Sequence, residues 1–296
     1  MPLTIVQGSV LNSRPNLNDT PSGYYCTVNP VEQSSTYKRI DISAGKCWDT
    51  TGTHWLEGPA YTKLGGSVWS GSDGGGLEED LTCVNSSAGK YIYAMRRDTG
   101  ANPIDYVMSL SPTWAGVNKP GPYTYGQLIG FAFYNRYVST TESGTAGWAP
   151  MLWIDNYCQY GYGQRYHESS VGTGNKDFDG YVVTPAPVNS IVNHTVVASA
   201  FGSSTDTEYS IYARPGNYTG ASSTGVTVSV DDKVFYQGHL RLFNGIREMG
   251  TNFQMALGSD QYISLAAIEY GGGSGAMTLS AYVNGFWMPN RLVATA

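Results

Sequence analysis

Alternation of apolar and polar side chains is the feature that most restricts what this chain can fold into. Residues 104–110 and 277–283 each place apolar side chains at every second position. These positions are Ile104, Tyr106, Met108 and Leu110 in the first segment, and Met277, Leu279, Ala281 and Val283 in the second. A period of two puts such side chains on one face of a β-strand, where they can pack against a core. The sequence therefore predicts half-buried antiparallel strands.

Turn-forming residues separate the alternating segments at intervals of about ten residues, which is typical of a β-sandwich. The chain has 37 Gly and only 14% charged residues, a composition that argues against long surface helices. The segment 91–110, YIYAMRRDTGANPIDYVMSL, has the layout of a β-hairpin. The apolar run 128–138 has the length of a strand buried on both faces. We therefore expect an all-β fold.

The chain divides into an arm and two modules. Residues 1–22 combine prolines with polar residues and show no sustained period, which predicts an extended N-terminal arm of the kind that binds a neighbour. The Gly- and Thr-rich segment STTESGTAG interrupts the pattern near residue 145, after which the alternation restarts. We expect two antiparallel, jelly-roll-like β-sandwich modules, one over residues 23–145 and one over residues 146–296.

Charge and hydropathy exclude two classes of partner. The formal net charge of −6 provides no basic field to hold a phosphate backbone, so we expect no nucleic-acid binding. No apolar run approaches the ~20 residues that a membrane-spanning helix needs, so we expect no membrane insertion. The N-terminal residues lack the basic start and apolar region of a secretion signal, which predicts synthesis and retention in a cytoplasm.

The segment 39–55, RIDISAGKCWDTTGTHW, contains Cys47, Asp49 and His54, which raises the question of a metal or nucleophile site. The four cysteines of the chain lie far apart without a CxxC pair, and His54 has no histidine partner at ligand spacing. The segment therefore predicts a strand, a turn in which Gly45 adopts a positive φ, and a return strand. We expect Cys47 or Trp48 to pack inward, and the cysteines to be buried free thiols.

Two groups of acidic residues could carry chemistry. The string Asn175–Gly180, NKDFDG, has the oxygen spacing of a calcium loop but lacks its final Glu, and we expect a plain loop. Glycoside hydrolysis needs two carboxylates that flank the bond, for which Asp155, Asp177 and Asp179 are candidates that the sequence cannot pair. We therefore assign no catalytic residue, metal or cofactor, and we expect a protein that is not an enzyme while keeping a glycan depolymerase as an alternative.

Aromatic residues cluster with glycine in segments that we expect to be loops, at 119–126, 158–167 and 284–291. Aromatic faces stack on sugar rings and anchor protein interfaces, although the same residues can complete a sandwich core. The candidate ligand contacts are Tyr160, Tyr162, Tyr166 and Trp287.

Two blocks of residues resemble a β-rich family of tail and tail-fibre proteins from double-stranded DNA bacteriophages and prophages. That family carries a segment like DIxAGxCRDSTN, and the matching residues here are Asp41, Ile42, Ala44, Gly45, Cys47, Asp49 and Thr50. A second family segment corresponds to residues 90–133, and its matching residues are Arg96, Arg97, Asp98, Thr99, Gly100, Asp105, Ser109, Pro112, Pro120, Tyr123, Ile129 and Gly130. The chain departs from the pattern at Trp48, where the family usually has Arg, and at Gln127 and Leu128, where it has an Arg pair.

The resemblance implies a virion structural protein, a tail fibre or similar tail appendage, made in the host bacterial cytoplasm. It also implies a homo-oligomer, most often a trimer, and a contribution to host attachment through a surface glycan. The N-terminal arm would contact other tail or head proteins of the virion. The alternatives are a capsid decoration or head-fibre protein that binds sugar, and a polysaccharide depolymerase. The family provides no catalytic residues.

Overall fold

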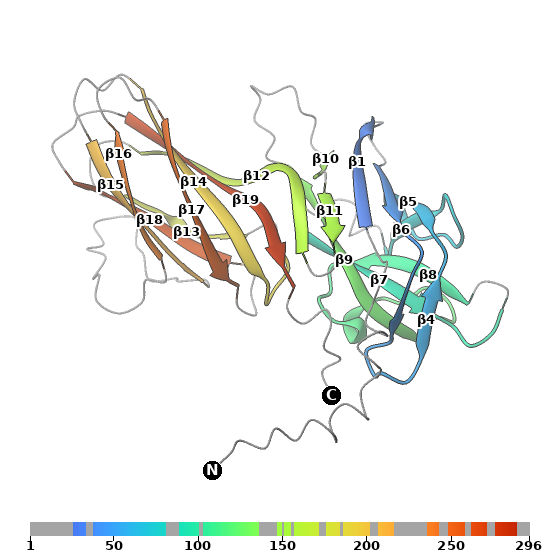
Figure 1. Cartoon of the computed structure of the whole chain (residues 1–296). Helices are drawn as coiled ribbons and strands as arrows, with labels where there is room; N and C mark the ends of the chain where they lie inside the picture. The colour runs from blue at the N-terminus through green and yellow to red at the C-terminus, as the bar shows by residue number, and fades with distance from the viewer. Residues whose placement is uncertain are drawn as a thin grey trace, which may run out of the picture.

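The computed structural model describes residues 26–33, 38–80, 89–100, 103–135, 147–149, 151–154, 157–171, 176–183, 186–201, 207–215, 236–242, 248–257, 262–270 and 276–288. These residues form an all-β structure in which curled sheets make a sandwich-like arrangement, as predicted (Figure 1). The predicted arm, residues 1–22, lies outside the described residues. Among the described residues, no helix has the length and hydrophobicity to span a bilayer.

Among the described residues, ten strands precede residue 150. They are β1 (Cys26–Gln33), β2 (Lys38–Ile42), β3 (Gly45–Trp48), β4 (Trp55–Gly58), β5 (Tyr61–Val68), β6 (Gly76–Glu78), β7 (Gly89–Arg96), β8 (Ile104–Ser109), β9 (Tyr125–Asn135) and β10 (Gly147–Trp148). One turn of 3-10 helix, η2 (Trp114–Gly116), lies between β8 and β9.

Nine strands follow. They are β11 (Met151–Ile154), β12 (Tyr157–Val171), β13 (Lys176–Val183), β14 (Ile191–Phe201), β15 (Thr207–Pro215), β16 (Tyr236–Leu242), β17 (Glu248–Ala256), β18 (Tyr262–Tyr270) and β19 (Ala276–Trp287). Figure 1 shows β13, β15, β16 and β18 near β14 and β17 on one side, and β4–β9 on the other.

The strands pair into three sheets. A 13-stranded sheet has the order β10-β9-β7-β8-β6-β5-β2-β1-β11-β12-β19-β14-β17, and a 4-stranded sheet has the order β13-β18-β15-β16. The third sheet is the β3–β4 hairpin. Because β1 pairs with β11, the large sheet runs across the boundary that we placed near residue 145. Whether the two modules fold separately stays a prediction.

The expectation of antiparallel sheets is wrong at one strand, β6. This three-residue strand runs parallel to β5 on one side and to β8 on the other. The reason is the loop after β5, in which Ser72 and Gly74 have positive φ. The chain turns back there until it reaches Leu64. It then turns again, so that Gly76 lies beside Leu64 and β6 runs in the direction of β5.

Strands β7 and β8 pair antiparallel as the hairpin predicted for residues 91–110. The expected half-buried character of β8 is wrong, because all of its residues are buried, while Leu110 lies beyond its end and is 36% exposed. Strand β9 covers residues 128–135 of the apolar run, and residues 129–133 are buried on both faces as expected, while residues 136–138 lie outside the described residues.

Two expected loops and the described start of a third are strands instead. The third is residues 284–291, of which 284–287 belong to β19. Residues 158–167 lie within β12, where Gly161 and Gly163 occupy outward positions. Glycine there marks an irregular register between Gln159 and Gln164 rather than a turn. Residues 176–180 lie in β13 with a similar irregularity after Asp177, so the plain-loop prediction for Lys176–Gly180 is also wrong, while Asn175 lies outside the described residues.

The core joins both halves of the chain through aromatic side chains. The ring of Phe131 in β9 makes edge contacts with Tyr91 at 5.3 Å and with Phe286 in β19 at 5.5 Å between centroids. Tyr160 in β12 lies 6.0 Å from Phe286. The Tyr91 hydroxyl accepts a hydrogen bond from the Val188 backbone N–H at 3.1 Å.

Candidate functional site

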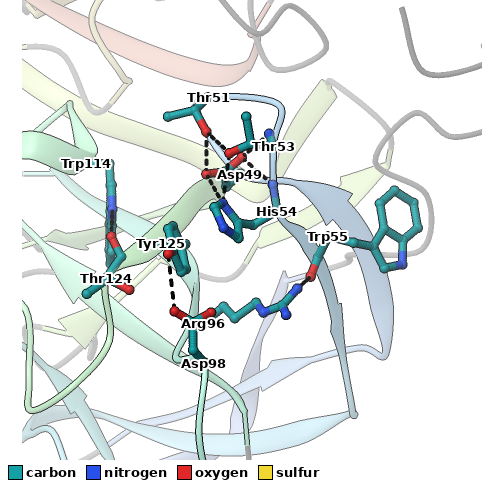
Figure 2. A network of polar contacts seen from close by, with 10 residues as sticks. All are labelled: Asp49, Thr51, Thr53, His54, Trp55, Arg96, Asp98, Trp114, Thr124 and Tyr125. Carbon is teal, nitrogen blue, oxygen red and sulfur yellow. Dashed lines mark hydrogen bonds and ion pairs between the residues drawn. The ribbon is translucent and has the colours of Figure 1, made fainter.

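The turn between β3 and β4 is organised by the carboxylate of Asp49, which is only 1% exposed (Figure 2). Oδ1 accepts the backbone N–H of Thr53 at 2.8 Å and of His54 at 3.1 Å, and Oδ2 accepts the Thr51 hydroxyl at 2.7 Å. Burial alone would raise the pKa of Asp49, but these hydrogen bonds and His54 together lower it. The carboxylate therefore stays ionised and holds the turn closed.

The imidazole of His54 packs against this turn rather than forming a reactive centre. Thr53 Oγ1 lies 2.8 Å from Nδ1, and Asp49 Oδ2 lies 3.4 Å from the same nitrogen. A histidine that acts as the base for a nucleophile while a carboxylate orients it uses its two nitrogens for the two partners. Here both partners are at Nδ1, and the ring stacks on Tyr125 with centroids 3.5 Å apart.

The expectation that residues 39–55 are structural agrees with strand β2 and with the inward packing of Cys47. The predicted return strand is wrong, because β3 pairs with β4 in a separate sheet, whereas β2 pairs with β1 and β5. Cys47 is fully buried and, like Cys158, is a free thiol. The detail at Gly45 is wrong, because Gly45 begins strand β3 and the positive φ of +70° belongs to Gly52 in the turn after it. Glycine suits that position because it has no Cβ to clash in the left-handed region.

Residues of the second motif block meet this turn directly. An Arg96 guanidinium nitrogen donates to the Trp55 carbonyl at 2.6 Å, and the Tyr125 hydroxyl donates to Asp98 at 3.2 Å (Figure 2). The Thr50 N–H donates to the Gly126 carbonyl at 3.0 Å. The two blocks that carry the family resemblance are therefore docked on each other.

Other motif residues also have structural partners. The Arg97 guanidinium lies over the Tyr123 ring at 5.4 Å. Gly100 has a φ of +110°, and a Cβ there would lie 2.8 Å from the Arg97 guanidinium carbon. At the departure from the family pattern, Trp48 packs edge-on against Trp55 with centroids 5.0 Å apart.

Two ion pairs are buried inside the first half of the chain. Lys63 Nζ lies 2.7 Å from Asp105 Oδ1, and Lys90 Nζ lies 3.2 Å from Glu78 Oε1. Burial lowers the pKa of Lys63, and the hydrogen bond and charge of Asp105 oppose that shift. Asp105 also accepts the Ser72 N–H at 3.0 Å, so this motif residue ties the loop after β5 to β8.

The candidate ligand aromatics lie in different environments. Tyr160 and Tyr166 are 3% and 6% exposed, so they offer no face to a ligand in this structure, and the expectation of ligand contact is corrected for both. Their alternation along β12 points them into the core, where the Tyr166 hydroxyl lies 3.1 Å from His194 Nδ1. Trp287 is half-buried and packs against Tyr157, and the side chain of Tyr162 lies outside the described residues.

The acid pair considered for glycoside chemistry stays a hypothesis. Asp177 and Asp179 lie on β13, but their side chains lie outside the described residues, as does the whole of Asp155. No group of three His, Cys, Asp or Glu side chains with metal-binding geometry occurs among the residues that the structure describes.

Sequence reasoning missed the outward-facing residues Tyr157, Asn193 and Asn252. They come from β12, β14 and β17, which belong to one sheet but not to neighbouring parts of the sequence. Alternation predicts which residues of a strand face outward. No local pattern in the sequence predicts the order in which the strands pair. Only the pairing of the strands brings these residues together.

Comparison with known proteins identifies no family. No family model and no curated protein matches the chain. A solved structure of Broad Bean Stain Virus matches with 8% identity over 97% of this chain and 95% of that chain, at a TM-score of 0.31. A structure described as "CBM4 structure and function" matches with 10% identity over 47% of this chain and 75% of that chain, at a TM-score of 0.21.

A third match is an exo-beta-1,3-galactanase from Phanerochaete chrysosporium with galactose. It has 11% identity over 88% of this chain and 69% of that chain, at a TM-score of 0.23. Similarities at this level carry no argument about what the chain does, so function has to be argued from its own residues.

Proposed function

We propose that the chain is a structural subunit of a bacteriophage virion, a tail fibre or similar tail appendage that contributes to host attachment. The observation that carries the proposal is the docking of the two motif blocks through Thr50, Arg96 and the stacking of Tyr125 on His54. These contacts join the β3–β4 turn to the β7–β8 hairpin and to β9. They expose no reactive group to solvent. Such a junction fixes elements mechanically, which suits a part that transmits load.

Self-assembly into a homo-oligomer, most simply a trimer, belongs to the same proposal. Within the described residues, β10 and β17 end the large sheet, and β13 and β16 end the small one. Strands at sheet edges have unpaired backbone groups, and neighbouring subunits are one way to cover them. The N-terminal arm would then bind other virion proteins.

The test combines purified particles with purified protein. Mass spectrometry of gradient-purified virions should detect the chain, and antibody labelling in electron micrographs should place it on the tail. Light scattering of the purified chain should give three times its 31.9 kDa mass. Absence from particles would refute the proposal, and labelling of the head would favour the decoration or head-fibre alternative instead.

The depolymerase alternative has a separate readout. Incubation with host polysaccharide would release reducing ends, and Asp155→Asn, Asp177→Asn or Asp179→Asn would abolish that release. No observation in the described residues pairs these carboxylates, so we keep the non-enzymatic role as the proposal.

A further inference from the structure

Four neighbouring strands present a polar, aromatic outer face. In the order β12-β19-β14-β17, alternate residues such as Tyr166, His194 and Phe253 are buried, while the residues between them face outward. The pairing registers align the outward residues in three rows. We call these rows the outer face, and they are Tyr157, Trp287, Ile191 and Ala256; Gln159, Gly285, Asn193 and Gln254; and Arg165, Tyr282, Thr195 and Asn252.

The first two rows hold a pair of aromatic rings at fixed positions. Tyr157 and Trp287 are cross-strand partners with ring centroids 4.5 Å apart and planes inclined by 35°. A Cβ on Gly285 would lie 2.6 Å from the Tyr157 hydroxyl oxygen, so the absence of a side chain at Gly285 lets the tyrosine lie across the sheet. The hydroxyl forms a hydrogen bond with the Asn193 side chain. Both rings are half-buried, which leaves part of each available to a ligand.

A directed chain of hydrogen bonds lies beside the rings. Asn284 Nδ2 donates to Thr195 Oγ1 at 2.6 Å, and the Thr195 hydroxyl, which has one proton, then donates to Asn252 Oδ1 at 2.5 Å. This order fixes both amide groups, so that Asn252 turns its NH₂ group and Asn284 turns its Oδ1 away from Thr195. A Cβ on Gly163 would lie 2.9 Å from Asn284 Oδ1, so the glycine also leaves room for that oxygen.

The charge of the outer face limits the class of ligand. The three rows contain no Asp or Glu and one cation, Arg165. Exposed aliphatic surface is also small there, with Ile191 at 38% exposure as the one large aliphatic side chain in the rows. Fixed amides with a donor and an acceptor beside partly exposed rings suit a ligand with many hydroxyls and flat C–H faces.

We propose that the outer face binds a neutral oligosaccharide that lies across the strands, stacked on Trp287 and Tyr157 and hydrogen-bonded by Asn193, Asn252 and Asn284. This inference rests on the attachment role proposed above, and it names the ligand class and the surface for that role. It also replaces the buried Tyr160 and Tyr166 by residues that face outward.

The test uses the full-length chain on an array of neutral and acidic oligosaccharides, followed by calorimetric titration of the best neutral ligand. Trp287→Ala and Asn252→Ala should each weaken binding by about tenfold or more, as the loss of an anchoring contact does. Two matched controls remove the same kinds of side chain from other strands, Trp55→Ala in β4 and Gln127→Ala in β9. Both controls should bind within about twofold of the unchanged protein. Circular dichroism should show that each variant is folded at the temperature of the titration.

Three outcomes would overturn the inference. They are binding of no neutral oligosaccharide, binding that Trp287→Ala and Asn252→Ala leave unchanged, and loss of oligomeric state in these variants without any effect on sugar binding. The last outcome would make the outer face a subunit interface. The array separates this inference from the proposed function, because a chain present in virions that binds no neutral sugar refutes only the inference. A chain that binds sugar but is absent from virions refutes only the virion role.

Discussion

At the scale of single residues, the most unusual environment in the described structure is that of His194 on β14. Its ring is fully buried between Phe253, with which it stacks at 5.0 Å, and Tyr166, whose hydroxyl lies 3.1 Å from Nδ1. Nε2 is buried without a hydrogen-bond partner. Burial lowers the pKa of His194 to about 3, so the folded protein holds this imidazole neutral.

His194 should make the protein less stable in weak acid. An unfolded histidine gains a proton below a pKa of about 6.5, whereas the folded one stays neutral, so the unfolded state binds more protons as the pH falls. Between pH 7 and pH 5 this linkage should remove about 2 kcal/mol from the free energy of unfolding. His194→Phe, which keeps a flat ring beside Phe253, should flatten the pH dependence measured by urea unfolding.

His54→Gln is the matched control for this measurement. The ring of His54 is 31% exposed and makes contacts with Thr53 and Asp49 at the surface, so its replacement should leave the acid sensitivity in place. If His194→Phe retained the full loss of stability between pH 7 and pH 5, another buried group would have to be responsible.

At the scale of elements, the β3–β4 hairpin depends on one side chain for its turn. Asp49→Ala removes the acceptor for two backbone N–H groups and one hydroxyl in a turn whose carboxylate is buried although Thr51 and Thr53 are exposed. We expect a loss of about 2 kcal/mol in the free energy of unfolding, because two backbone N–H groups would lose their charged partner. Urea unfolding at pH 7 measures this loss.

A matched substitution separates the hydroxyl contact of Asp49 from its two backbone contacts. Thr51→Val removes one of the three hydrogen bonds of Asp49 and leaves both backbone bonds intact. It should cost about 1 kcal/mol. An equal cost for Asp49→Ala and Thr51→Val would mean that the carboxylate does not organise the turn.

Individual strands and hairpins could be predicted from the sequence because alternation is a local signal. The β7–β8 hairpin follows directly from it, and β9 follows from the length of the apolar run 128–138. In β12 the signal was present too, since Cys158, Tyr160, Gln164 and Tyr166 are all buried at alternate positions, but the intervening glycines resembled a turn. The order of strands in the large sheet had no such signal, because pairs such as β1–β11 and β12–β19 join segments distant in sequence.

The same limit explains what the sequence showed of the candidate sites. The polar turn at Asp49 was predictable because all of its hydrogen-bond acceptors and donors lie within five residues. Its docking on Tyr125 and Arg96 was not, since it depends on the position of β9 beside β7. The outer face is the more extreme case, because its three rows exist only after four strands have paired.

At the scale of the whole molecule, one aromatic cluster joins the two halves of the chain. Phe286 of β19 is fully buried and contacts Phe131 of β9 and Tyr160 of β12. The large sheet crosses between the same halves through the pairing of β1 with β11. A continuous sheet and a shared core both favour a single cooperative unit over two modules that unfold independently.

Phe286→Ala should therefore destabilise both halves together. Removing a buried phenylalanine leaves a cavity and costs about 3–5 kcal/mol, and differential scanning calorimetry should show one transition that moves to lower temperature as a whole. Ile191→Ala, on the same sheet but 38% exposed, should shift the transition little and serves as the control. Two transitions, of which Phe286→Ala moves only one, would show instead that residues 23–145 and 146–296 unfold as separate modules.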